Sequence, residues 1–197
     1  KSVGLVRAYH NTIHAIDDVG NDDDGVQCVG SRGFRNQTYR NNVFLVGRYV
    51  ITHELCDSEN TSYDYDLMST KDPNRFVKWD NGTRYNSLRS FQLGTGQAMH
   101  AINAEPQFEG LAAGDLRLTP TSPGIDAGTD LIGLNDANSP WPYTGSRPDL
   151  GAVELGGVPA PEEPVNEPPV LAPIGAQTIR EGETLSFSVS ASDPNGD

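Results

Sequence analysis

The chain has 197 residues, of which 36% are hydrophobic, and it contains 21 glycines and 14 prolines. A low apolar content with so many turn-forming residues favours short strands and turns over a helical protein. The formal net charge of −13 argues against nucleic acid and anionic lipid as partners, because both would be repelled. The sequence also lacks an apolar run long enough for membrane insertion.

The first 70 residues carry a weak internal repeat. Residues 9–13 read YHNTI and residues 39–43 read YRNNV, so the two copies lie 30 residues apart, and residues 64–67 form a degenerate third copy. Such a repeat is typical of stacked coils of parallel strands, in which each coil buries one face on the next. Polar turn residues such as Asn11 and Asn41 are expected to stack on their equivalents and to satisfy backbone groups.

Residues 75–97 contain a cluster of large apolar side chains. The cluster consists of Phe76, Trp79, Tyr85, Leu88 and Phe91. A segment this short, rich in aromatics and bounded by glycines, is predicted to be a cap that covers the stack. The only helical periodicity in the chain, a weak one, falls near residues 87–92.

Two phrases after the cap are the most specific part of the sequence. Residues 116–128 read LRLTPTSPGIDAG and residues 145–154 read GSRPDLGAVE. Both resemble the closing segment of bacterial right-handed parallel β-helix proteins of the pectate-lyase-like superfamily. The resemblance covers most of residues 1–155 and implies an all-β fold, with these residues forming the C-terminal coils and cap of a β-helix. We expect Asp126 and Asp149 to accept backbone N–H groups in turns.

A change of composition follows the closing phrases. Residues 156–169 are rich in proline and glutamate and are expected to form an extended linker. In residues 170–197, Leu185, Phe187 and Val189 alternate with serines, which indicates a half-buried strand. This segment resembles the first strands of bacterial cadherin-like or immunoglobulin-like modules, which are antiparallel β-sandwiches. We therefore expect an incomplete module there, after a β-helix domain at 1–155.

The acidic composition is compatible with calcium, since hard cations prefer oxygen ligands. Residues 193–197 read DPNGD and resemble the calcium-binding phrase of cadherin-like repeats, which implies Asp193, Asn195 and Asp197 as ligands. A plain turn is the alternative. The three consecutive carboxylates at 22–24 point to opposite faces in a strand and more often form a solvated loop.

The two cysteines, Cys28 and Cys56, do not form a metal-binding pattern. Their separation of 28 residues is close to the period of the repeat, which predicts that they lie on neighbouring coils. A disulfide between them is one possibility, and two buried thiols are the other.

The β-helix resemblance implies a secreted, carbohydrate-associated protein, located outside the cell or at its surface, with a polysaccharide or cell-surface glycan as partner. One interpretation is the C-terminal part of a polysaccharide-degrading enzyme, a lyase or glycoside hydrolase. The alternative is a non-catalytic adhesin or structural protein that uses the β-helix as a rigid spacer. Lyases of this superfamily need a basic residue and a cation near a uronate carboxylate.

Three residues are candidates for substrate binding. His10 and Arg40 would stack on adjacent coils and could contact an anionic sugar, whereas Trp79 could stack on a sugar ring. Alternatively, His10 and Arg40 are surface residues without a role in binding, and Trp79 belongs to the core. Ser122 lies in neither a nucleophile elbow nor a motif with a paired histidine. No catalytic motif of the superfamily can be matched, so we expect this chain by itself to be inactive.

Overall fold

The computed structural model describes residues 5–16, 23–29, 35–136, 138–139, 141–156 and 168–193. Three parallel sheets form its first part, and in each sheet a strand pairs with the strand three places later in the chain. The first sheet contains β1 (Val6–Tyr9), β4 (Gln37–Arg40) and β7 (Ser62–Asp64). The second contains β2 (Thr12–Ala15), β5 (Val43–Val46) and β8 (Leu67–Thr70). The third contains β3 (Val26–Val29), β6 (Ile51–Glu54) and β9 (Val77–Trp79).

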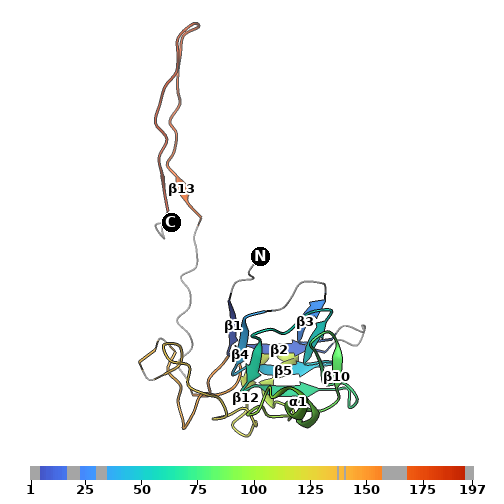
Figure 1. Ribbon diagram of the computed structural model, residues 1–197. Helices are drawn as coiled ribbons and strands as arrows, with labels where there is room; N and C mark the ends of the chain where they lie inside the picture. The colour runs from blue at the N-terminus through green and yellow to red at the C-terminus, as the bar shows by residue number, and fades with distance from the viewer. Residues whose placement is uncertain are drawn as a thin grey trace. The chain divides into compact units, whose positions relative to one another are not determined.

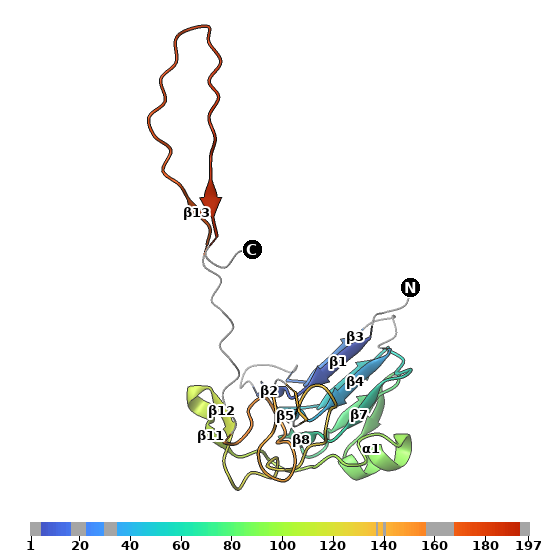
Figure 2. The same cartoon turned by 90° about the vertical axis from the view of Figure 1, so that its left-hand side faces the viewer.

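This i, i+3, i+6 pairing is the arrangement of a parallel β-helix, and it confirms the fold class expected from the sequence. Figure 2 shows β1, β4 and β7 side by side, with β2, β5 and β8 stacked in the same order. The described coils therefore number three: β1 to β3, β4 to β6, and β7 to β9. Strands of four residues or fewer suit this design, because each needs only to bridge one side of a coil.

The register between the first two coils differs from the expected one. Tyr9 pairs with Arg40 and Thr12 pairs with Val43, so the first step is 31 residues. The predicted 30-residue period is therefore wrong by one residue. The reason is that the two tyrosines used to align the copies point to opposite faces. Tyr39 is buried, and its partner across the ladder is Ala8, so a shift of one residue exchanges the faces.

A column of left-handed residues marks the corner between the first and second sheets. His10, Asn41 and Tyr65 have φ values of 52°, 58° and 54°. Each directly follows the last residue of a strand in the first sheet. The N–H of His10 donates to the Arg40 carbonyl at 3.2 Å, and that of Asn41 donates to the Tyr65 carbonyl at 2.8 Å. The true equivalent of Asn41 is therefore His10, and that of Asn11 is Asn42.

The next position in each coil forms a polar ladder. The Nδ2 of Asn11 donates to Oδ1 of Asn42 at 2.9 Å, and the Nδ2 of Asn42 donates to Oδ1 of Asp66 at 2.8 Å. The same two oxygens accept the backbone N–H groups of Asn11 and Asn42, at 3.0 and 2.8 Å. Stacked polar side chains thus satisfy backbone donors at the corner, as the sequence predicts, although with the corrected register.

The interior of the stack is apolar and aromatic. Its largest group of buried residues is Tyr39, Phe44, Val46, Val50, Ile51, Tyr63, Met68, Phe76, Val77, Trp79, Phe91 and Ala98. Tyr39 and Tyr63 stack at 4.2 Å between ring centroids with their planes 3° apart. The first coil contributes smaller, partly buried residues, namely Ala8, Ile13, Ala15 and Val26.

A hairpin and a helix complete the third coil. β10 (Thr83–Tyr85) pairs antiparallel with β9, and α1 (Leu88–Thr95) follows it. The Ser87 side chain accepts the Ser90 N–H and caps the helix, which ends at Gly96. Phe91 is fully buried and meets the rings of Trp79 and Tyr85 edge-on, so the aromatic segment closes the stack beside β7 (Figure 2).

The closing segment begins with a small antiparallel pair, β11 (Phe108–Gly110) and β12 (Asp115–Leu118), joined by a turn of 3₁₀ helix at Leu111–Ala113. Its later residues then return along the outside of the second sheet. Leu150 packs on Val43 and Leu67, and the N–H of Gly151 donates to the Asn41 carbonyl at 2.7 Å. Gly151 has a φ of 95°, and a Cβ there would lie 2.7 Å from Oγ1 of Thr12.

The closing phrases are held by the two aspartates expected to be structural. Oδ1 of Asp149 accepts the N–H of Asp126 at 2.7 Å, and Oδ2 accepts that of Leu155 at 2.7 Å. Oδ1 of Asp126 accepts the N–H groups of Ser146 and Arg147 at 2.8 and 3.2 Å. The guanidinium carbon of Arg147 also lies 5.8 Å from the centroid of the Tyr65 ring. This contact joins the second closing phrase to the third coil.

Residues 159–197 form a second unit. In it β13 (Val170–Leu171) and β14 (Ala191–Ser192) pair antiparallel, and a turn at residues 180–183 reverses the chain (Figure 1). Leu185, Phe187 and Val189 are about half exposed, at 43%, 47% and 54%. Their alternation is that of a strand with one apolar face, and in the described residues that face has no opposing sheet.

Candidate functional site

The outer face of the third sheet carries a row of polar side chains. The row consists of Gln27, Thr52, Lys78 and Arg84, paired in that order across β3, β6, β9 and β10. Side chains alternate along a strand, so the row lies on the face opposite Ile51 and Val77, but Thr52 and Lys78 are themselves buried, at 1% and 8%, and only Gln27 and Arg84 are exposed. Adjacent strands lie about 4.8 Å apart, which makes the row an extended surface rather than a point site.

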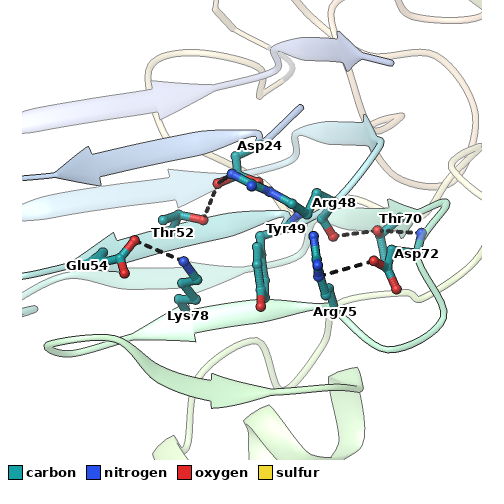
Figure 3. Close-up of polar contacts among 9 residues, drawn as sticks. All are labelled: Asp24, Arg48, Tyr49, Thr52, Glu54, Thr70, Asp72, Arg75 and Lys78. Atoms are coloured by element: carbon teal, nitrogen blue, oxygen red, sulfur yellow. Dashed lines mark hydrogen bonds and ion pairs between the residues drawn. The ribbon is translucent and has the colours of Figure 1, made fainter. Parts of the chain in front are cut away.

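Tyr49 lies beside this row and is surrounded by three cations. The nitrogen of Lys78 lies 5.0 Å from the ring centroid, and the guanidinium carbons of Arg48 and Arg75 lie 5.8 and 6.0 Å from it. Figure 3 shows the ring between the side chains of Lys78 and Arg75. Because Tyr49 is only 5% exposed, it supports the cations and does not offer a free stacking face.

Asp24 anchors Arg48, one of these cations. Its side chain is 1% exposed and receives two hydrogen bonds from Arg48, at 2.8 and 3.1 Å (Figure 3). Oγ1 of Thr52 donates to it at 2.6 Å and the N–H of Tyr49 at 3.1 Å. Burial alone would raise the pKa of Asp24, but these hydrogen bonds outweigh it and lower the pKa below its usual value.

The other two cations around Tyr49 have more exposed partners. Nζ of Lys78 contacts a carboxylate oxygen of Glu54 at 2.9 Å, and Nε of Arg75 contacts Asp72 at 3.2 Å. Lys78 is 10% exposed at its side chain, whereas Glu54 and Arg75 are each 45% exposed. The hydrogen bond from Lys78, with its charge, lowers the pKa of Glu54. The surface therefore alternates cations with carboxylates.

A shallow depression of about 370 Å³ adjoins this surface. It is lined by Tyr49, Asn74, Arg75, Arg84, Tyr85, Asn86 and Ser90. Arg84 is exposed, and in the part of the chain that the structure describes it has no carboxylate within ion-pair distance. Arginine, amide and hydroxyl groups are donors suited to carboxylate, sulfate or phosphate oxygens. The lining of this depression therefore suits an anionic group.

Two of the predicted binding residues, His10 and Arg40, lie together on the opposite corner. His10 is half-buried, and its Nε2 contacts the Nδ2 atoms of Asn41 and Asn135 at 3.0 and 2.7 Å. Burial lowers the pKa of His10. Arg40 donates to the carbonyls of Tyr39 and Ser62 and to the hydroxyl of Ser62. Both side chains are thus engaged within the protein, and their role in binding stays a prediction.

Trp79, the third predicted binding residue, lies on the third sheet away from that pair. It is 7% exposed, stacks on His53 at 4.7 Å and belongs to the core. Its remaining exposed edge helps to line a second depression, of about 390 Å³. The other lining residues are Asp57, Ser58, Glu59, Asp80 and Gln97.

The cysteines are joined. Cys28 and Cys56 form a disulfide with a Cα separation of 6.3 Å, and it links the first coil to the second. The calcium candidates are only partly described, since Asn195 and Asp197 lie outside the described residues and Asp193 is half-buried at their edge. Elsewhere in the described ranges, groups of three or more histidine, cysteine or acidic side chains placed to hold a metal do not occur.

The basic surface was not indicated by the sequence. Arg75 and Arg84 lie in the segment interpreted as a cap, and their approach to Tyr49 depends on β9 joining the third sheet and β10 folding back on it. A usable signal was the alternation in residues 76–79, FVKW, which places Lys78 on the face opposite Val77 and Trp79.

Comparisons with protein-family models, curated proteins and solved structures found no match. None of the described helices is long and apolar enough to cross a membrane.

Proposed function

We propose that this chain belongs to a secreted, carbohydrate-associated β-helix protein and that the outer face of its third sheet binds an anionic polysaccharide. The observation that carries the proposal is the depression beside Tyr49, in which Arg75 and Arg84 meet amide and hydroxyl groups. The closing phrases, which resemble those of pectate-lyase-like proteins, support the carbohydrate class. The Cys28–Cys56 disulfide supports an oxidising location outside the cell.

The charge pattern favours a linear polyanion over a small anion. Lys78 and Arg84 lie in line on β9 and β10, and Arg48 and Arg75 lie beside them around Tyr49, although the chain as a whole has a net charge of −13. A polysaccharide with one carboxylate per sugar could place successive charges along this line, and the surrounding acidity would reject anions that do not fit. In a degrading enzyme of this class the surface would be an outlying part of the substrate path.

The alternative is a non-catalytic surface protein that uses the β-helix as a spacer. One observation favours it: Arg48, Lys78 and Arg75 each have a carboxylate partner, so these three also make sense as a neutralised, structural face. Arg84 separates the two possibilities, because among the described residues it is the basic member of the depression without such a partner.

The test is titration of the 197-residue chain with polygalacturonate and, separately, with a neutral glucan of similar length. We expect binding to polygalacturonate that weakens as sodium chloride is raised, because exposed charges are screened. Arg84→Ala should weaken it about tenfold, since a hydrogen bond to a charged group contributes about 1.5 kcal/mol or more.

Arg117→Ala is the matched control. Arg117 is also exposed but pairs with Asp115 on β12, so its loss removes the same charge without touching the depression. Equal losses in both variants would show that only net charge matters. Equal binding of the neutral glucan would overturn the proposal for an anionic ligand.

A further inference from the structure

The end of the second coil, together with the turn that follows it, contains a serine–histidine pair that the basic surface does not use. Nδ1 of His53 and Oγ of Ser58 lie 2.8 Å apart, within the range of a nucleophile and its general base. His53 is fully buried in β6, whereas Ser58 lies in a turn where its N–H donates to Asp80 at 3.2 Å and its carbonyl accepts from Thr61 at 3.0 Å. The histidine is therefore fixed, and the serine is held against it by its own backbone.

The direction of the hydrogen bond follows from a chain of buried groups behind the histidine. The hydroxyl of Tyr39 donates to Oε1 of Gln37 at 3.0 Å, so it can only accept from the hydroxyl of Tyr63, to which it is hydrogen-bonded. Tyr63 then has no proton left for His53, whose Nε2 lies 3.4 Å away, and must accept from it. A proton on Nε2 leaves Nδ1 as the acceptor for Ser58.

The protonation state agrees with that direction. Burial lowers the pKa of His53 to about 4, so the imidazole is neutral at neutral pH. Burial likewise raises the pKa of Tyr63 well above its usual value, so its hydroxyl keeps its proton. All hydrogen bonds from Ser58 through His53 to Gln37 thus point in one direction, and the Ser58 hydroxyl is the first donor of this chain.

That hydroxyl faces a place for a ligand. Ser58 lines the depression of about 390 Å³ together with the edge of Trp79 and the carboxylates of Asp57, Glu59 and Asp80. Asp57 and Glu59 both pair with Arg35, at 2.6 and 2.9 Å, so their charge is partly neutralised, but their oxygens can still accept hydrogen bonds from hydroxyl groups. An indole edge contacts the apolar side of a ring. The depression therefore suits a neutral, hydroxyl-rich molecule, unlike the basic depression beside Tyr49.

We propose that Ser58 is a nucleophile, activated by His53, that takes the acyl group from an O-acyl ester of a neutral, hydroxyl-rich alcohol. Oγ of Ser58 bonds to the ester carbonyl carbon while its proton passes to Nδ1 of His53. The bond from that carbon to the alcohol oxygen breaks, and the alcohol leaves with the proton from Nδ1. Water then attacks the acyl-serine in the same way and releases the carboxylic acid.

Tyr63 acts as a positioning residue, because it holds the tautomer of His53 and does not itself touch the ester. The low basicity of the buried imidazole makes acylation and deacylation slow, so the covalent adduct is the best readout. This activity is independent of polysaccharide binding at the other depression. Finding it would also overturn the expectation from the sequence that the chain is inactive.

The experiment is labelling of the folded chain with a fluorophosphonate, followed by intact mass and peptide mapping. We expect one adduct per chain, at Ser58, which Ser58→Ala abolishes and Ser146→Ala leaves unchanged, since Ser146 is an exposed serine. Labelling should fall with acid and be half-maximal near pH 4, where His53 gains its proton. Tyr63→Phe should slow labelling about tenfold or more without moving the site, because the tautomer is no longer held.

Circular dichroism of each variant shows that it is folded. Hydrolysis of 4-nitrophenyl acetate, a neutral ester, supplies a second measurement and should disappear with Ser58→Ala. A folded wild-type chain that is not labelled at Ser58, or that labels Ser58 no faster than Ser146, would overturn the proposal. A labelling rate that does not change between pH 3 and pH 6 would overturn the role of His53.

Discussion

Asp24 and Asp66 are both removed from water in the β-helix, but their surroundings differ. Asp24 meets the guanidinium of Arg48, the hydroxyl of Thr52 and a backbone N–H, and its pKa is lowered. Asp66 sits at the end of a ladder of amides. Its Oδ1 accepts two bonds from Asn42, while its Oδ2 is buried without a hydrogen-bond partner.

The outcome for Asp66 is the reverse of that for Asp24. Burial raises the pKa of Asp66 to about 7, although Asn42 and the more distant charge of Arg40 act against the increase and that of Asp64 adds to it. A carboxylate therefore stays ionised inside this stack only where a cation and several donors meet both of its oxygens. The ladder position of Asp66 supplies donors to only one of the two carboxylate oxygens. A neutral amide side chain is therefore expected to be more stable there than a charged carboxylate.

The largest expected effect comes from breaking the Asp24 site. Arg48→Met keeps much of the aliphatic stem but leaves a buried, unpaired carboxylate, so we expect a loss of about 3–5 kcal/mol in the free energy of unfolding at pH 7. Because the folded pKa of Asp24 is lowered, the stability it supplies is present above its unfolded pKa of about 3.8 and disappears on acidification through the folded value. Denaturant unfolding at pH 7 and pH 3 measures both.

Asp24→Asn in the Arg48→Met background is the control, since a neutral amide removes the unpaired charge. It should recover part of the loss at pH 7. A variant whose stability deficit is the same at pH 3 as at pH 7 would show that packing of Arg48, and not its charge, is what matters.

The second largest effect has the opposite sign. With a folded pKa of about 7 and an unfolded value of 3.8, the folded chain keeps a proton on Asp66 that the unfolded chain loses between these pH values. The stability is therefore full below pH 3.8 and falls as the pH rises towards 7. The difference of roughly three pKa units corresponds to about 4 kcal/mol. Asp66→Asn should be more stable than the wild type at pH 8, by up to that amount.

The advantage of Asp66→Asn should shrink steadily as the pH is lowered to 4, where Asp66 of the wild type is protonated. Chemical unfolding at pH 8, 6 and 4 provides the measurement. Asp130→Asn removes the same charge at an exposed position and is the control for the change of net charge. If Asp66→Asn were less stable than the wild type at pH 8, the ladder would require the carboxylate for a reason that its contacts do not show.

A smaller effect sharpens the account of Asp24. Thr52→Val keeps the shape of the side chain and removes only the hydroxyl that donates to Oδ2 at 2.6 Å. We expect a loss of about 1.5–3 kcal/mol at pH 7, the range for a hydrogen bond to a charged group. A loss below about 0.5 kcal/mol would mean that Arg48 and the N–H of Tyr49 satisfy both oxygens without the hydroxyl.

The sequence predicted the stack better than it predicted these sites. The repeat of asparagines and the closing phrases indicated parallel coils, and the three sheets confirm them. The register was wrong by one residue because Tyr9 and Tyr39 look equivalent in sequence but lie on opposite faces. Only the identity of the buried partner, Ala8 for Tyr39, distinguishes the two alignments, and a small residue gives little signal.

The pairing of distant side chains was beyond what the sequence could indicate. Asp24 is the third of three adjacent aspartates, and its meeting with Arg48 depends on the step between the first two coils. The Ser58–His53 contact depends on a turn after the disulfide that no repeat marks. In each case the deciding quantity is the length of a loop between strands, and loops of a β-helix vary most.

The smallest predicted effect tests the ladder at its exposed end. The Nδ2 of Asn11 donates to Oδ1 of Asn42, but the backbone N–H of Asn11 donates to the same oxygen at 3.0 Å and does not need the side chain. Asn11→Ala should therefore cost only about 0.5–1 kcal/mol, because the side chain is exposed and the acceptor stays satisfied. Asn42→Ala, in the fully buried middle, removes the acceptor of the Asn11 N–H and the donor to the Ala8 carbonyl, and should cost several times more. Thermal unfolding of the two variants under one condition gives the comparison. Equal losses would mean that the ladder acts as one cooperative unit from its first amide. The hydrogen bonds that Asp66 accepts at the far end would then depend on every amide in the ladder.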